Sequence, residues 1–262
     1  MSKTRLALKY LQYKMNACTD HDLHSPFVYN LYTELIRNKH QYYDFETLNQ
    51  VRNQLLQNNT SLLIEDLGAG SKTFHNNRRY IKDIAAHGIS QKKYAEFLYR
   101  LANKFAPATI VELGTSLGLT TLYLAKACPR SRVYTIEGSE SLFNTANSIF
   151  SQQKQTNIET IRGNFDTAFP ELLKSIPSLD LLYIDGNHAY EPTMRYFESA
   201  LSKKTNSSVF IFDDIYWSPG MEKAWHEIRQ HPEVTLSLDL FYIGIIFFRK
   251  EQKQKEHFVL RY

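Results

Sequence analysis

The feature that most constrains the fold is a regular alternation of β-rich runs and helical segments that begins near residue 108. The first five runs are separated by segments with helical spacing, in which apolar residues such as Leu142, Ala146 and Ile149 recur on one face. Alternation of this kind predicts a parallel sheet that is covered by helices on both faces. The runs are Thr109–Leu113, Arg132–Glu137, Asn157–Arg162, Asp180–Asp185, Ser208–Asp213, Val234–Asp239 and Ile243–Arg249.

The last two runs, within SLDLFYIGIIFFR, have too few residues between them for a helix. A connection this short makes a hairpin, so one of these strands must run antiparallel to the rest. The sequence therefore predicts an α/β fold with a doubly wound, mostly parallel sheet of seven strands that ends in an antiparallel hairpin.

The front of the chain has a different pattern. Residues 1–89 are mostly helical and rich in Tyr and His, with one β-like run at Ser61–Ile64, and we interpret them as a helical cap or lid on a core of residues 90–262. The glycine-rich stretch Glu65–Ser71 fits either a connector or, with His75, Arg78 and Arg79, a mobile lid that faces an anionic substrate. The sequence leaves that choice open.

Composition and charge exclude several classes of protein. Hydrophobic residues make up 43% and charged residues 22%, as in a globular domain rather than a disordered chain or a disulfide scaffold. The net charge of +4 is concentrated in residues 1–105, which hold fifteen basic and nine acidic side chains. Two cysteines, no signal-peptide pattern and no apolar run near the ~20 residues of a membrane span predict a cytoplasmic protein without a membrane partner.

The first β-rich run ends in a glycine turn, ELGTSLGLTT, that contains Glu112, Gly114, Ser116 and Gly118. A strand that feeds such a turn and then a helix brings backbone N–H groups and the helix N-terminus to a ligand. The second run ends in Glu137, an acid that can accept hydrogen bonds from a ribose diol. The turn lacks the G-x-G-x-x-G spacing of nicotinamide-dependent dehydrogenases.

In this motif the chain resembles the class I S-adenosylmethionine-dependent methyltransferases, which have a Rossmann-like fold. ELGTSLGLTT is closest to the E-x-G-x-x-x-G-x-[ST] variant of catechol-type and related small-molecule O-methyltransferases, and the resemblance covers roughly residues 90–249. It implies S-adenosylmethionine as the cofactor, with Glu137 on the ribose and Gly163, Asn164 and Phe165 beside the adenine. The full set of cofactor-binding residues that it implies is Glu112, Gly114, Thr115, Ser116, Gly118, Glu137, Gly138, Gly163, Asn164, Phe165 and Asp185.

Acidic residues follow the fourth and fifth runs, as IDGNHAY and FDDIYW. Because ligands bind at the carboxyl ends of parallel strands, Asp185, Asp213 and Asp214 should converge there with His188. Three ionised carboxylates in one cleft need a counter-charge, and oxygen ligands favour Mg²⁺. Metal-dependent O-methyltransferases carry similar acids, so the resemblance implies a site that Mg²⁺ can occupy, with Asp185 and His188 as catalytic groups and His188 as the candidate base.

The chain lacks the [DNS]-P-P-[YFW] run of amino-methylating nucleic-acid enzymes and has no cysteine in the region where cytosine C5 enzymes carry their nucleophile. We therefore expect methyl transfer to a hydroxyl of a small molecule and do not expect a nucleic-acid partner. Two alternatives remain: an RNA or protein methyltransferase that docks through its basic N-terminal region, and a catalytically silent module. A homodimer is compatible with the sequence.

Overall fold

The computed structural model describes residues 3–38, 40–64 and 77–262, and the chain forms two compact units. Unit 1 consists of Met1–Lys39 with Pro177–Tyr262, and unit 2 of His40–Ile176. The predicted cap of residues 1–89 thus contributes to both units, and its role as a lid stays a prediction. The helices of unit 1 are α1 (Lys3–Asn16), α2 (Pro26–Leu31), α9 (Tyr190–Leu201) and α10 (Pro219–Gln230), with a 3-10 turn at Asp20–Asp22 and a π-helical segment at Tyr32–Arg37.

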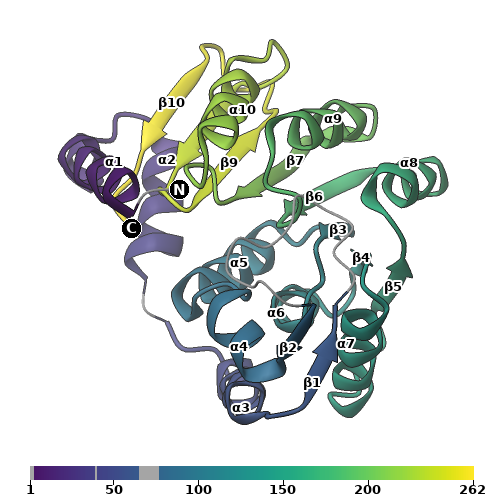
Figure 1. The fold of residues 1–262 in the computed structure, drawn as a ribbon. Helices are drawn as coiled ribbons and strands as arrows, with labels where there is room; N and C mark the ends of the chain where they lie inside the picture. Colours follow the sequence, from purple (N-terminus) through teal and green to yellow (C-terminus); the bar gives the residue numbers. More distant parts are fainter. Residues whose placement is uncertain (1–2, 39, 65–76) are drawn as a thin grey trace. The chain divides into compact units, whose positions relative to one another are not determined.

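Unit 2 contains three parallel strands with β4 in the middle, paired to β3 on one side and to β5 on the other. Their connections α6 and α7 lie on one face of the three strands, as right-handed crossovers require (Figure 1). The helix α5, predicted from its apolar face, buries Phe97, Leu98 and Leu101 and packs against α6. The elements of this core are α3 (Asp44–Gln57), α4 (Ile81–His87), α5 (Lys92–Phe105), β3 (Thr109–Leu113), α6 (Leu119–Ala127), β4 (Arg132–Glu137), α7 (Glu140–Gln152), β5 (Ile158–Arg162) and α8 (Phe165–Ser175).

Unit 1 contains five strands in the order β10-β8-β9-β7-β6. Among the described residues of this unit, β9 is the one strand that runs antiparallel to its neighbours, so the predicted hairpin of β8 and β9 is confirmed. The prediction of seven strands is too low, because β10 adds an eighth that pairs in parallel with β8. The strands are β6 (Leu179–Ile184), β7 (Lys204–Asp213), β8 (Leu236–Asp239), β9 (Ile243–Phe247) and β10 (Glu256–Val259).

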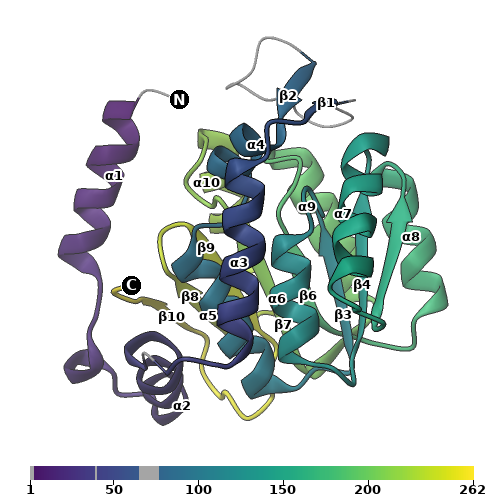
Figure 2. The same cartoon turned by 90° about the horizontal axis from the view of Figure 1, so that it is seen from below.

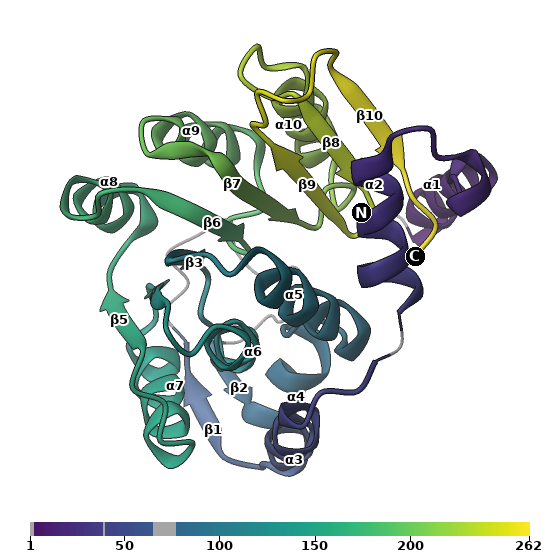
Figure 3. The ribbon, with the colours of Figure 1, turned by 180° about the vertical axis from the view of Figure 1, so that it is seen from behind.

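Within unit 1, the chain around the end of α1 contacts the end of β10, and α2 lies beside that strand (Figure 3). The Tyr13 hydroxyl donates to the Leu260 carbonyl at 2.6 Å. The Cys18 N–H donates to the Val259 carbonyl at 2.7 Å, and Cys18 forms a parallel bridge with Leu260. These bonds cover the outer edge of β10 with chain from the N-terminal region.

A small antiparallel ribbon, which we call the β1–β2 ribbon, consists of β1 (Ser61–Leu63) and β2 (Arg78–Tyr80) and lies beyond the end of α3 (Figure 2). The β-like run predicted at residues 61–64 is confirmed, whereas β2 was not predicted. The stretch Glu65–Ser71 and His75, on which the lid hypothesis rests, lie outside the described residues.

A helix that crosses a bilayer must be long and apolar. None of the described helices, over residues 3–38, 40–64 and 77–262, is long and apolar enough to cross a membrane.

Candidate functional site

The glycine turn after β3 has an unusual backbone, with three left-handed residues at alternate positions. The φ angles are 110° at Gly114, 49° at Ser116 and 77° at Gly118. Glycine adopts such angles without strain, whereas a left-handed serine costs roughly 1 kcal/mol. Gly118 is also the N-cap of α6. The spacing that identified the motif thus corresponds to a backbone path that reverses sharply between the strand and the helix.

Several N–H groups of this turn bond to the protein itself. Those of Gly114 and Thr115 both donate to the Ile136 carbonyl of β4, at 3.1 and 3.3 Å, and that of Gly118 donates to the Thr115 carbonyl at 2.8 Å. The expectation that these backbone donors face a ligand is therefore wrong at these three positions. A pyrophosphate-binding turn keeps such donors for its anion, so the arrangement disfavours a phosphate ligand.

Glu137 ends β4 beside this turn and holds it from the other side. Its carboxylate accepts from the Ser116 N–H at 2.8 Å through Oε2 and from the Ser139 N–H at 2.9 Å through Oε1. A carboxylate accepts up to about four hydrogen bonds, so these two bonds do not exclude a ribose diol. The turn and the acid that the motif predicted as one site are brought together in unit 2.

Glu112 lies beneath the turn and is fully buried. The hydroxyl of Thr121 on α6 donates to its Oε2, and so does the hydroxyl of Thr135 on β4, at 2.6 Å. The Thr115 and Thr135 hydroxyls are 2.6 Å apart, and because the Thr135 proton goes to Glu112, Thr115 is the donor between them. Glu112 therefore fixes the turn through α6 and β4, and its contact with a cofactor stays a prediction.

The residues predicted to flank an adenine follow β5, next to the end of β4. The Gly163 N–H donates to the Glu137 carbonyl at 3.0 Å. Asn164 is the N-cap of α8 and accepts from the Asp166 N–H at 2.8 Å, and Phe165 is the first residue of that helix. All three residues thus lie at the same carboxyl edge as Glu137, as the resemblance implies.

Gly118 offers a direct test of the packing around the turn. A Cβ at this position would lie 2.6 Å from the ring of Phe150 and 3.2 Å from the Cβ of Ala146. Because overpacking and a left-handed alanine act together, Gly118→Ala should lower the free energy of unfolding by about 2–4 kcal/mol. Thermal unfolding measures the loss. In Gly220→Ala the added Cβ meets ordinary contacts of 3.4 Å or more, and an equal loss in this control would contradict the argument.

The acidic residues predicted from the fourth and fifth runs meet in unit 1. Ile184 of β6 pairs in parallel with Phe212 of β7, so Asp185 and Asp213 leave their strands at the same end. Asp185 accepts from the Tyr183 hydroxyl at 3.1 Å through Oδ2, and its Oδ1 lies 3.6 Å from His188 Nε2.

Mutual repulsion and burial raise the pKa values of two of these carboxyl groups. Burial raises the pKa of Asp213 well above its ordinary value, and the charges of Asp185 and Asp214 raise it further. Burial also raises the pKa of Asp214, against the opposing effect of His188. The cluster therefore requires a proton, an imidazolium or a bound cation as a counter-charge.

The Asp213→Asn variant tests this description of the cluster. The pKa of Asp213 is higher in the folded state than in the unfolded state. At a pH between these two pKa values, the folded state holds a proton that the unfolded state lacks. The free energy of unfolding therefore falls as pH rises through this interval. The variant should be more stable than the parent by on the order of 1 kcal/mol above the interval, and the gain should vanish in acid. Melting temperatures measured from pH 4 to 8 in EDTA test both statements.

Asp22 provides the control of opposite sign. Hydrogen bonds from Thr19 lower the pKa of Asp22, so the contribution of Asp22 to stability is present at neutral pH and is lost as pH falls. Asp22→Asn should therefore bring no gain at pH 8. A gain there as large as that of Asp213→Asn would mean that the cluster has no special role.

The metal assignment to Asp185, Asp213 and Asp214 stays a prediction. Over the part of the chain that the structure describes, no three His, Cys, Asp or Glu side chains are grouped in a way that could hold a metal ion. The side chains as they stand do not form a Mg²⁺ site, and we derive no chemical step from one.

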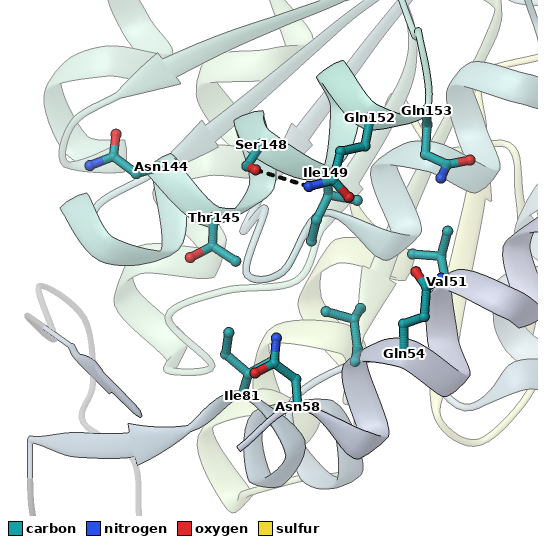
Figure 4. A pocket seen from close by; sticks show the side chains of 11 residues that line it. Val51, Gln54, Asn58, Ile81, Asn144, Thr145, Ser148, Ile149, Gln152 and Gln153 are labelled. Atoms are coloured by element: carbon teal, nitrogen blue, oxygen red, sulfur yellow. Dashed lines mark hydrogen bonds between the residues drawn. The ribbon is translucent and has the colours of Figure 1, made fainter. Parts of the chain in front are cut away.

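A pocket of about 380 Å³ lies in unit 2 between α3, the start of α4 and α7 (Figure 4). Its side chains are uncharged, and it includes none of the predicted site residues. On its α7 wall, Gln152 Nε2 donates to the Ser148 hydroxyl at 3.3 Å. The lining residues are Val51, Gln54, Leu55, Asn58, Ile81, Asn144, Thr145, Ser148, Ile149, Gln152 and Gln153.

Comparisons with known proteins bear on the fold. Residues 111–215 match the family model for a methyltransferase domain. The O-methyltransferase TomG from Streptomyces achromogenes, solved in complex with SAM, is 21% identical with a TM-score of 0.56, over 62% of this chain and 82% of that one. The O-methyltransferase from Bacillus cereus, solved in complex with SAH, is 18% identical with a TM-score of 0.56, over 83% of this chain and 99% of that one.

A curated relative is similar over a shorter stretch. The uncharacterized protein y4gI of Sinorhizobium fredii is 26% identical over 173 residues, which are 61% of this chain and 19% of that protein. The match thus spans about a fifth of the length of that relative.

Together these comparisons identify the fold. The chain has the mixed α/β, mostly parallel fold of these solved methyltransferases, and residues 111–215 match the family model for a methyltransferase domain. The fold class and the resemblance predicted from ELGTSLGLTT are both confirmed.

Proposed function

We propose that the protein transfers the methyl group of S-adenosylmethionine to a hydroxyl of a small molecule. The observation that carries the proposal is the position of the Glu137 carboxylate. It accepts hydrogen bonds from the Ser116 and Ser139 N–H groups and so fixes the turn at the predicted ribose site. An acid at this position suits a neutral diol. The N–H groups of the turn already bond within the protein, so this acidic site suits a cationic sulfonium better than a phosphate.

The residues of unit 2 fit this cofactor by the chemistry of their groups. Glu137 would accept the ribose hydroxyls, and Gly163, Asn164 and Phe165 would flank the adenine at the neighbouring strand end. Two solved neighbours of this fold are complexes with SAM and SAH, which supports the same cofactor here. When bound, S-adenosylmethionine supplies a methyl group that is already activated for attack.

The task left to the protein is to remove one proton and to align the acceptor. In the proposal, His188 would accept the proton of the acceptor hydroxyl. Asp185, 3.6 Å away, would stabilise the resulting imidazolium, and Asp214 interacts favourably with that charge. This assignment routes no step through a metal, so EDTA should leave activity unchanged, and loss of activity in EDTA would contradict it.

A binding and turnover experiment tests the function. The full chain is titrated with SAH in a calorimeter, and separately with NAD, and is then incubated with methyl-labelled SAM and a panel of catechols and simple phenols. Binding of SAH with label transferred to an oxygen supports the proposal. Binding of NAD in place of SAH would refute it, and label that appears only on RNA or protein would replace the acceptor class.

A further inference from the structure

The β1–β2 ribbon is joined to the start of α7 by a hydrogen bond that spans 78 positions of the chain. The Ser141 hydroxyl donates to the Leu63 carbonyl of β1 at 2.6 Å. Both partners belong to unit 2, and Ser141 lies in the first turn of α7, four residues after Glu137. The ribbon is therefore fastened to the segment that carries the predicted ribose acid.

A short relay continues from Ser141 to that acid. The hydroxyls of Ser139 and Ser141 are 3.2 Å apart. A serine hydroxyl has one proton, and because that of Ser141 goes to Leu63, Ser139 must be the donor between the two serines. The Ser139 N–H in turn donates to Glu137 Oε1. The order of bonds from the ribbon to the carboxylate is thus fixed.

The behaviour of Ser139 supports a dedicated role for this relay. Ser139 is the N-cap of α7, where a serine hydroxyl ordinarily accepts from the backbone N–H two or three residues later. Here it makes no such capping bond and turns to Ser141. A side chain that could cap the helix is bonded instead to Ser141, while the Ser139 backbone N–H bonds to Glu137.

At its other end the ribbon is tied to the segments next to α3 and α4. The Ile81 N–H donates to the Thr60 carbonyl at 2.9 Å, and the Lys82 N–H donates to the Asn58 carbonyl at 3.0 Å. The far end of β1 is solvent-accessible, with 59% of Leu63 exposed. The Ser141 bond is therefore made at an exposed part of the ribbon, at the opposite end of β1 from these two bonds.

We propose that Ser141 is a positioning residue that couples the β1–β2 ribbon to the cofactor site through Ser139 and Glu137. The inference rests on the proposed function, because it takes Glu137 as the ribose-binding acid. A nucleoside held by Glu137 orders the turn, the turn orders the serine relay, and the relay holds the ribbon. By thermodynamic reciprocity, a fastened ribbon must favour nucleoside binding to the same extent.

The Ser141→Ala variant removes the link at its centre. Loss of one neutral hydrogen bond should raise the dissociation constant for SAH about threefold to tenfold. Ser141→Thr keeps the hydroxyl and should restore parental affinity. Ser148→Ala makes the same chemical change on α7, at a hydroxyl whose partner is Gln152, and should leave the affinity unchanged.

Amide hydrogen exchange supplies a readout that a merely structural role would not move. In the parent, SAH should slow exchange in residues 61–64 and 78–80 of the ribbon, and in Ser141→Ala this slowing should disappear while residues within β3 respond as before. An affinity within twofold of the parent together with an undiminished slowing would overturn the inference.

Two further measurements keep the outcomes distinct. If Ser141→Ala does not fold, Ser139→Ala breaks the other half of the relay and leaves the Leu63 bond intact, and it must also abolish the response of the ribbon. If the parent does not bind SAH, the proposed function has failed and the inference fails with it. If the parent binds and both variants behave like it, the inference alone is wrong.

Discussion

Replacing His188 by glutamine is expected to lower kcat by about 10²- to 10⁴-fold, the usual contribution of a general base. Glutamine keeps the size and polarity of the side chain but cannot accept the proton of the acceptor hydroxyl. The affinity for SAH should stay within about twofold of the parent, because His188 is not among the residues to which cofactor binding is assigned. Single-turnover kinetics with methyl-labelled cofactor, combined with calorimetry, separate the two effects.

A matched histidine variant makes this test specific to His188. His226 lies on the exposed surface of α10, and His226→Gln should behave like the parent. Full activity in His188→Gln would exclude the imidazole and direct attention to the carboxylates of Asp185 and Asp213.

Replacing Glu137 by alanine is expected to raise the dissociation constant for SAH about 100-fold. The change removes two charge-assisted bonds that fix the turn, at the Ser116 and Ser139 N–H groups, and the predicted acceptor of the ribose hydroxyls as well. Glu137→Gln keeps one oxygen acceptor but presents an NH₂ group to the second donor, so an intermediate loss of about tenfold is expected.

The neighbouring acid Glu140 provides the matched control. Glu140 is exposed in the first turn of α7 and pairs with Arg162 at 3.0 Å, away from the turn N–H groups. Glu140→Gln should leave the affinity for SAH unchanged in the same calorimetric titration. Equal losses at Glu137 and Glu140 would show that the effect is one of net charge, and the ribose assignment would then be wrong.

The fold was predictable from the sequence wherever local pattern and burial coincide. The runs at Thr109–Leu113 and Arg132–Glu137 match β3 and β4, because buried β-rich runs bounded by turns have few alternatives. The β10 strand was missed because EHFV follows a polar stretch and gains its place through pairing with β8, which local sequence does not reveal.

The helix α7 shows how precisely apolar spacing predicts which residues of a helix are buried. Leu142 and Ala146 are buried on α7 as predicted, but the third buried position is Phe150 and Ile149 is only partly covered. One helical residue is a rotation of about 100°, and an apolar stripe is broad enough to hide an error of that size.

The sequence predicted which of the candidate site residues lie near one another better than it predicted their hydrogen bonds. The motif located Glu112, the glycines and Glu137, and parallel-sheet geometry brought Asp185 to Asp213. The motif did not show that the N–H groups of the turn bond within the protein, because those bonds depend on the backbone path. Ser139 and Ser141 carried no signal at all, since Ser141 meets Leu63 only through the tertiary fold.

The split composition of unit 1 has a consequence for the order of events during synthesis. Unit 2 is one continuous stretch, His40–Ile176, so every residue that it needs has been made before residues 177–262 follow. Unit 1 combines residues from both sides of that stretch, because β10 pairs with β8 and Cys18 pairs with Leu260. Helices α1 and α2 must therefore wait, without these partners, until β10 has been made.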